Sequence, residues 1–176
     1  VQFSLWLLPL GLMAGLAALF VTRRLIAARA SLPALLKAGL ARGEIYPVYQ
    51  PIVDLSTGRW VGAEVLARWG QSNGESVSPD VFVPIAERHG MIATLTRSII
   101  EASTGEMADL VRGQPGFFLS INVASADLHE PAFVAHITAC CRARGLGNER
   151  LHLEITERNE VDSETAAETI RTLRGM

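Results

Sequence analysis

Residues 62–69 read Gly-Ala-Glu-Val-Leu-Ala-Arg-Trp, and this stretch decides the fold that we expect. Its small and apolar residues are typical of a buried β-strand, in which alternate side chains point to opposite faces. Glu64, Leu66 and Arg68 would then share one face. Charged side chains are costly to bury without a partner. Glu64 and Arg68 therefore either pair with each other or together hold a ligand, such as a metal bound to a phosphate.

Strands and helices alternate on both sides of this stretch. Residues 45–55 predict a strand that its two prolines make bulged or place at an edge, and a turn at 56–59 joins it to the strand at 60–69. Helices are expected over 79–89, 93–112, 131–144 and 163–174, with Ser78 and Ser163 as N-caps. The apolar runs 117–123 and 151–155 predict strands buried in a parallel sheet. The fold class is therefore α/β, and a barrel is one such architecture.

Three polar side chains lie near the ends of these apolar runs, on three different strands. They are Glu64, Asn122 and Glu154. Three oxygen ligands at the carboxyl ends of parallel strands suit a hard cation, Mg²⁺ or Mn²⁺. The spacing alone leaves an alternative open, in which Asn122 is a cap and the glutamates pair with arginines. Gln50, in an apolar setting, is equally compatible with a ligand contact and with a backbone contact.

The N-terminal segment Phe3–Val21 is nineteen residues long and carries no charge. As a helix it would measure about 28 Å, close to the hydrocarbon thickness of a bilayer, which predicts a transmembrane helix over residues 1–22. Arg23, Arg24 and Arg29 follow it, and positive residues mark the cytoplasmic side. We therefore expect an inner-membrane protein whose remaining domain is cytoplasmic. A buried core helix and a signal peptide are the alternatives.

Residues 23–43 connect this segment to the α/β part. They predict a linker helix that Ser31 caps and Gly43 ends, and it either is a passive tether or transmits a signal in a dimer. The net charge of −2, with Lys37 as the only lysine, argues against a nucleic-acid-binding surface. The adjacent Cys140 and Cys141 would point about 100° apart on a helix, so we expect reduced thiols. Both chain ends look cut, so we expect a piece of a longer protein.

Five segments, in this order, resemble the EAL-domain cyclic di-GMP phosphodiesterases. The resemblance covers the chain from about residue 44 to its end. It implies the N-terminal portion of a (β/α)8, TIM-like barrel, so the expected organisation is a transmembrane helix (1–22), a linker helix (23–43) and an incomplete EAL domain (44–176). The matching segments are residues 49–53 (Tyr-Gln-Pro-Ile-Val), 62–69, 79–87 (Pro-Asp-Val-Phe-Val-Pro-Ile-Ala-Glu), 118–123 (Phe-Leu-Ser-Ile-Asn-Val) and 151–157 (Leu-His-Leu-Glu-Ile-Thr-Glu).

The resemblance implies metal-dependent hydrolysis of cyclic di-GMP to linear pGpG in bacterial second-messenger signalling, by a homodimer formed through the EAL domain. It implies that Glu64 is catalytic and binds the metal ion with Asn122 and Glu154, and that Arg68 and Gln50 contact the substrate. The signature here is Glu-Val-Leu instead of Glu-Ala-Leu, a mild change. The chain lacks the Asp-Asp-Phe-Gly motif and the catalytic lysine of the family, so we expect these 176 residues alone to be inactive. A non-catalytic cyclic di-GMP receptor and a scaffold without a ligand are the competing readings.

Overall fold

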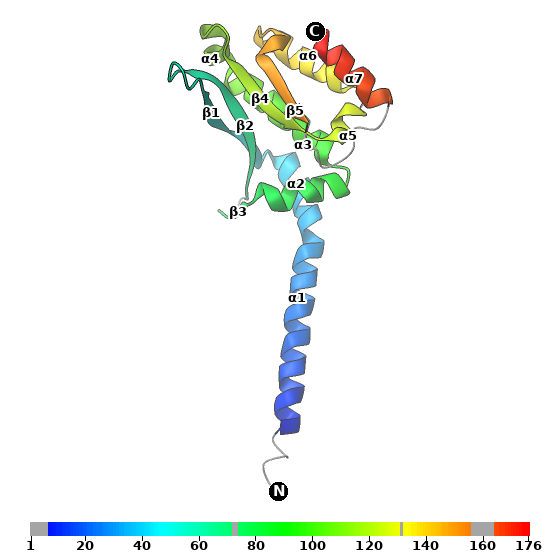
Figure 1. Cartoon of the computed structure of the whole chain (residues 1–176). Helices are drawn as coiled ribbons and strands as arrows, with labels where there is room; N and C mark the ends of the chain where they lie inside the picture. The colour runs from blue at the N-terminus through cyan, green and yellow to red at the C-terminus, as the bar shows by residue number, and fades with distance from the viewer. Residues whose placement is uncertain (1–6, 72–73, 131, 156–163) are drawn as a thin grey trace.

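A computed structural model describes residues 7–71, 74–130, 132–155 and 164–176 of the chain. It shows an α/β body from which one long helix, α1, extends (Figure 1). The elements, in chain order, are α1 (Leu7–Arg42), β1 (Ile45–Val53), β2 (Trp60–Gly70), β3 (Ser76–Val77), α2 (Pro79–Arg88), α3 (Ile92–Glu106), α4 (Ala108–Gly113), β4 (Phe118–Val123), α5 (Ser125–Leu128), α6 (Phe133–Arg144), the 3₁₀ turn η2 (Asn148–Arg150), β5 (Leu151–Ile155) and α7 (Glu164–Arg174).

The strands form one mixed sheet in the order β1-β2-β4-β5, with β3 paired to β2. β1 and β2 form the expected antiparallel hairpin, while β2–β4 and β4–β5 are parallel. β1 lies at the edge of the sheet and its register shifts between Ile52 and Val53, which confirms the edge position and bulge that its prolines predicted. The parallel ladders confirm the α/β class, and the sheet is consistent with part of a TIM-like barrel.

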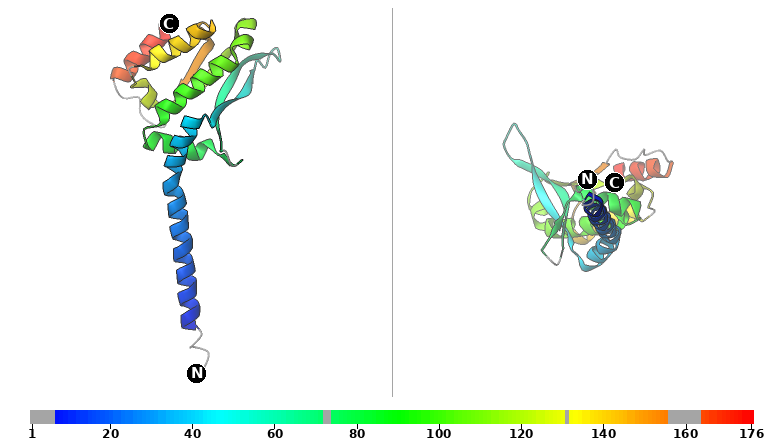
Figure 2. Two further views of the ribbon diagram at one scale, coloured as in Figure 1. Left: turned by 180° about the vertical axis from the view of Figure 1, so that it is seen from behind. Right: turned by 90° about the horizontal axis from the view of Figure 1, so that it is seen from below.

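The two faces of the sheet have different surroundings. One face carries the buried side chains of Trp69, Leu119, Ile121 and Val123, and the core continues from them into the helices. Seen from behind, α3 lies across the strands on this side (Figure 2), and α6 packs against α3. The opposite face carries polar residues, described below. Burial of the apolar face against helices therefore fixes which side of each strand remains available for a site.

The helix boundaries differ from the prediction in two places. The helix expected over 93–112 is divided at Met107, whose backbone (φ −95°, ψ 0°) leaves the helical region. Gly105 just before this break lowers the helix propensity there. The linker helix expected to start after Ser31 is instead part of the continuous α1, which contains Pro33. The strong helix formers around Pro33 outweigh the cost of one proline, so Ser31 is not a cap.

Several other predictions of local structure can be compared directly. The helix α1 ends at Arg42, and Gly43 follows it with φ +70°, as predicted. Ser78 caps α2 by accepting a hydrogen bond from the Asp80 N–H. Both cysteines are free thiols. The short strand β3 was not predicted. The expected cap Ser163 lies outside the described residues.

The predicted transmembrane helix falls partly outside the structure, since residues 1–6 lie outside the described part. Within the described ranges, no helix combines the length and the apolar character that are needed to cross a membrane.

Candidate active site

The residues that the sequence singled out lie together on the polar face of the sheet. Strand alternation and register put them on the side opposite the helices. Gln50 of the edge strand lies directly opposite Glu64, and Asn122 lies beside Glu154. The polar face therefore carries all five predicted site residues, which are Gln50, Glu64, Arg68, Asn122 and Glu154.

Two hydrogen bonds cross this face diagonally from β4. Asn122 Nδ2 donates to Glu64 Oε1 at 3.2 Å, and Ser120 Oγ donates to Glu154 Oε1. In the ladders, however, Ser120 is the neighbour of Glu64 and Asn122 is the neighbour of Glu154. Each polar residue of β4 thus bonds to a carboxylate whose own ladder partner lies two residues away on β4, a distance that diagonal neighbours can bridge. The strand β4 joins the two carboxylates into one cluster.

The structure answers whether Glu64 and Arg68 pair with each other. Four residues of extended chain span about 13 Å, so the two side chains would have to extend fully toward each other to pair. The Arg68 guanidinium instead donates from Nη1 to the Ala67 carbonyl oxygen at 2.9 Å. Among the described residues, no ion pair joins Glu64 to Arg68. The pairing alternative is therefore wrong for these two residues.

A cavity of about 230 Å³ lies where the carboxyl ends of β2 and β4 meet the helices α2 and α3. Arg68 and Asn122 both line it, so these two predicted site residues share one space. Two carboxylates of α2, Asp80 and Glu87, and the α3 residue Thr96 also line it. These three residues carry no local sequence signal for a site, because only the fold brings α2 and α3 to the ends of β2 and β4.

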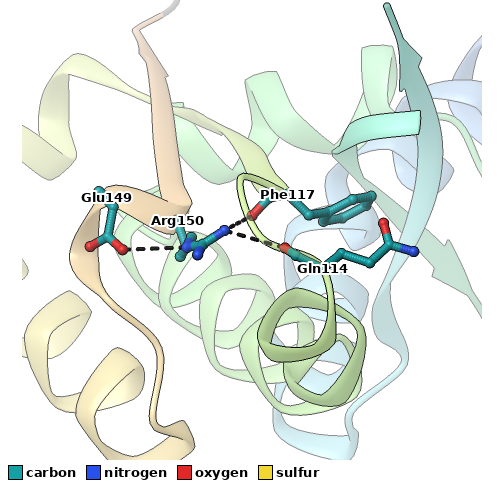
Figure 3. Close-up of polar contacts among 4 residues, drawn as sticks. All are labelled: Gln114, Phe117, Glu149 and Arg150. Carbon is teal, nitrogen blue, oxygen red and sulfur yellow. Dashed lines mark hydrogen bonds and ion pairs between the residues drawn. The ribbon is translucent and has the colours of Figure 1, made fainter. Parts of the chain in front are cut away.

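The register between β4 and β5 is held at their amino ends by Arg150 (Figure 3). Its Nη1 lies 3.2 Å from the Phe117 carbonyl oxygen and 3.4 Å from that of Gln114, just before β4. Its Nε donates to Glu149 Oε1 at 3.3 Å. These contacts lie just before the first residue pair of the ladder, Leu119 and Leu151, and Asn122 pairs with Glu154 toward its other end.

The chain leaves β4 through a turn that Asp127 stabilises. Asp127 is 1 % exposed, and its Oδ2 accepts hydrogen bonds from the Ala124 N–H and from Thr96 Oγ1, each at 2.9 Å. Burial raises the pKa of this carboxyl above its usual range, although the two hydrogen bonds oppose the shift. Asp127 thus connects Ala124, which follows β4, to Thr96 of α3.

The donor set of the polar face fits a hard divalent cation. Glu64 and Glu154 each use one oxygen in a hydrogen bond to β4, and their second oxygens have no partner among the described residues. With the Asn122 amide oxygen they supply three oxygen ligands, the kind that Mg²⁺ and Mn²⁺ prefer. In the described part of the chain, no group of three or more His, Cys, Asp or Glu side chains is placed to hold a metal ion. The candidate set depends on an asparagine for its third ligand.

Ser120 was missed by the sequence analysis. It is 2 % exposed, whereas Asn122 and Glu154 are exposed. A usable signal was present, because Ser120 is polar, lies inside an apolar run and precedes Asn122 by two residues. Strand alternation puts such a residue on the same face as Asn122.

The chain is similar in sequence to proteins named as probable cyclic di-GMP phosphodiesterases. The protein named "Probable cyclic di-GMP phosphodiesterase PdeB" from Escherichia coli (strain K12) is 35 % identical over 173 residues, which cover 98 % of this chain and 33 % of that protein. "Probable cyclic di-GMP phosphodiesterase PdeG" from the same organism is 35 % identical over 150 residues, covering 83 % of this chain and 29 % of that protein. The chain thus spans about a third of the length of these relatives.

Solved structures have the same fold. The structure "EAL enzyme Bd1971 - cAMP bound form" superposes with a TM-score of 0.75 at 25 % identity, over 93 % of this chain and 47 % of that chain. "PaMucR Phosphodiesterase, c-di-GMP complex" gives a TM-score of 0.73 at 23 % identity, over 82 % and 60 %. The family model described as "EAL domain" matches residues 33–176. This chain therefore belongs to the EAL domain family.

Proposed function

We propose that the whole protein hydrolyses cyclic di-GMP to linear pGpG with the help of Mg²⁺ or Mn²⁺. The observation that carries this proposal is the convergence of Glu64, Asn122 and Glu154 from three adjacent strands on one solvent-accessible face. The names of the relatives, which are cyclic di-GMP phosphodiesterases, support the choice of substrate.

In this proposal some residues of the polar face bind the cation and others contact the substrate. Glu64, Asn122 and Glu154 hold the cation, which supplies charge neutralisation and a more acidic bound water when it is present. Glu64 is also the catalytic carboxylate. Arg68 presents a planar guanidinium to a phosphate oxygen pair of the substrate. Gln50, opposite Glu64 on the exposed edge strand, contacts the substrate from the other side.

The size of the cavity agrees with a ligand that is only partly enclosed. Pockets that enclose a drug-sized molecule usually measure about 300–1,000 Å³, and the cavity at Arg68 and Asn122 measures about 230 Å³. We therefore expect one portion of the cyclic dinucleotide to enter this cavity. The remainder would lie over the polar face, where Glu64 and Gln50 are accessible.

The test uses the purified full-length protein with cyclic di-GMP and Mg²⁺ or Mn²⁺, with pGpG measured by chromatography. We expect turnover that EDTA removes and that Glu64→Ala lowers by at least about 10³-fold, since removing a group that acts on the reacting centre costs several kcal/mol. The matched control is Glu168→Ala, because Glu168 is an exposed glutamate of α7. It should retain wild-type turnover. Retained turnover in Glu64→Ala would reject the assignment of this residue.

The same assay separates hydrolysis from binding without turnover. Calorimetric titration of the full-length protein with cyclic di-GMP in the presence of Ca²⁺ measures binding alone. Binding with no pGpG formed under any divalent cation would identify a cyclic di-GMP receptor and reject the hydrolase proposal. Absence of both binding and turnover would instead favour an interaction scaffold.

Three further expectations complete the proposal. The 176 residues alone should not form pGpG, because they lack the aspartate pair and the lysine that the family resemblance implies. Fractionation of cells should find the full-length protein with the inner membrane, and light scattering should find a homodimer. Each of these remains a prediction of the sequence, and each has its own measurement.

A further inference from the structure

We infer that Ser120 is a positioning residue, whose hydroxyl orients the Glu154 carboxylate for cation binding. The inference rests on the proposed function, because it takes Glu154 as a cation ligand. Ser120 Oγ donates to Glu154 Oε1, and the residue is 2 % exposed. A buried hydroxyl without a partner is costly, so this hydrogen bond has little freedom to exchange with water.

The position of Ser120 on the sheet makes it central to the cluster. It lies beside Glu64 in the β2–β4 ladder and beside His152 in the β4–β5 ladder. The rings of His152 and Phe118 stack with centroids 3.9 Å apart. Ser120 therefore has an aromatic pair and two carboxylates as its neighbours on this face. A donor at this point stabilises a negative charge on the face, whereas an apolar side chain there would leave Glu154 Oε1 without its partner.

The diagonal geometry explains how the hydroxyl acts. Glu154 is the ladder neighbour of Asn122, yet one of its oxygens accepts a hydrogen bond from Ser120, two residues before Asn122 on β4. This contact fixes the rotation of the carboxylate. The other oxygen has no hydrogen-bond partner in the described ranges of the chain and is left to bind a cation. Groups that orient a metal ligand in this way contribute about 10–100-fold to metal affinity.

The experiment measures Mn²⁺ affinity of the full-length protein by electron paramagnetic resonance of the free ion, without substrate. Three variants are compared with the wild type. Ser120→Ala removes the donor, Ser120→Cys fills the space with a weak donor, and Ser120→Thr keeps the hydroxyl. The matched control is Ser103→Ala, because Ser103 is also fully buried and its hydroxyl donates to the Ile100 carbonyl oxygen within α3, at 3.3 Å.

We expect Ser120→Ala and Ser120→Cys to weaken Mn²⁺ binding by about 10–100-fold, while Ser120→Thr and Ser103→Ala stay within about threefold of the wild type. Ser120→Cys decides the question if Ser120→Ala does not fold, because it preserves the packing. Wild-type affinity in a folded Ser120→Ala or Ser120→Cys protein overturns the inference, as does an equal loss in Ser103→Ala.

The outcome also separates this inference from the proposed function. Wild-type turnover with unchanged Mn²⁺ affinity in the Ser120 variants rejects the positioning role alone. Mn²⁺ binding that depends on Ser120, in a protein that forms no pGpG, supports the positioning role and rejects the hydrolase. A wild-type protein that binds no Mn²⁺ overturns the inference directly.

Discussion

The packing of β2 against β4 next to the polar face leaves no room for a side chain at Gly62. A Cβ atom added at Gly62 would lie 2.8 Å from the Phe118 carbonyl oxygen and 3.0 Å from two atoms of its ring. Gly62 and Phe118 are partners in the β2–β4 ladder, two residues before Glu64 and Ser120. The ring can turn away from an added methyl group, but the carbonyl oxygen is part of the ladder. Gly62→Ala should therefore force the two strands apart next to the site.

The expected cost follows from two opposing effects. Overpacking of this kind costs about 1–3 kcal/mol, and replacing glycine by alanine in a strand returns about 0.5–1 kcal/mol of conformational entropy. The middle of these two ranges leaves a net loss of about 1 kcal/mol. A domain of this size shifts by about 2–4 °C per kcal/mol, so the melting temperature should fall by about 2–4 °C.

The assay is thermal unfolding of the full-length protein, followed by tryptophan fluorescence, to which the fully buried Trp69 contributes. The matched control is Gly113→Ala, because a Cβ at this α4 residue would have no atom within 4 Å. It gains the same entropy without the contact, so its melting temperature should stay level or rise. A Gly62→Ala protein with the same melting temperature as Gly113→Ala would refute the argument.

A double variant separates the two contacts of the added methyl group. If the Phe118 ring alone were responsible, Phe118→Ala would remove the cost of Gly62→Ala. We expect most of the cost to remain, because the carbonyl oxygen is present in both backgrounds. A coupling energy between Gly62→Ala and Phe118→Ala that equals the full net loss of Gly62→Ala would show that the ring, and not the backbone, makes glycine necessary at this position.

Three other predictions concern the framework around the site. Because the pKa of Asp127 is raised, the folded state binds its proton more tightly than the unfolded state, so stability falls as pH rises from about 4 through the folded pKa. Over this pH window, the free energy of unfolding of Asp127→Asn, measured with urea, should therefore rise relative to that of the wild type. A difference between the two proteins that stays constant with pH would contradict the burial argument. Gly145→Ala should lower stability by about 1–2 kcal/mol in the same assay, because Gly145 ends α6 with φ +66°; an unchanged midpoint would contradict this. Burial raises the pKa of Cys141 to about 11, so maleimide at pH 7 should modify Cys140 first and Cys141 only after unfolding, as mass spectrometry of peptides would show.

Alternation predicted the face on which Glu64, Asn122 and Glu154 lie, and the structure places them together there. Spacing alone left open whether they bind a ligand or act as a cap and as partners of arginines, and the choice between these came from the family resemblance. Their roles stay predictions. Asp80 and Glu87 depend on information that no single segment contains, because only the fold brings α2 to the ends of β2 and β4. The face on which Ser120 lies follows from alternation, but its hydrogen-bond partner does not. Ser120 bonds to Glu154 and not to its ladder neighbour Glu64, and this choice depends on the register between β4 and β5. Arg150 supports that register through the carbonyl groups before β4.

The helix boundaries failed for a related reason. Local propensity gives a helix from 93 to 112 and a new helix after Ser31, because each segment considered alone has suitable residues. In the folded chain, the break at Met107 separates α3, which packs against β1 and α6, from α4. Packing of this kind is a property of the whole fold, and single-segment patterns do not contain it.

The separation of Glu64 and Arg68 limits what the polar face can bind. They share a face of β2, but about 13 Å of extended strand lies between them. No hydrogen bond or ion pair joins their side chains among the described residues. A ligand that contacts the carboxylate cluster at Glu64 and the guanidinium at Arg68 would extend along β2 toward the cavity that Arg68 shares with Asn122. The spacing within Glu-Val-Leu-Ala-Arg is therefore compatible with the extended dinucleotide that we propose as the substrate.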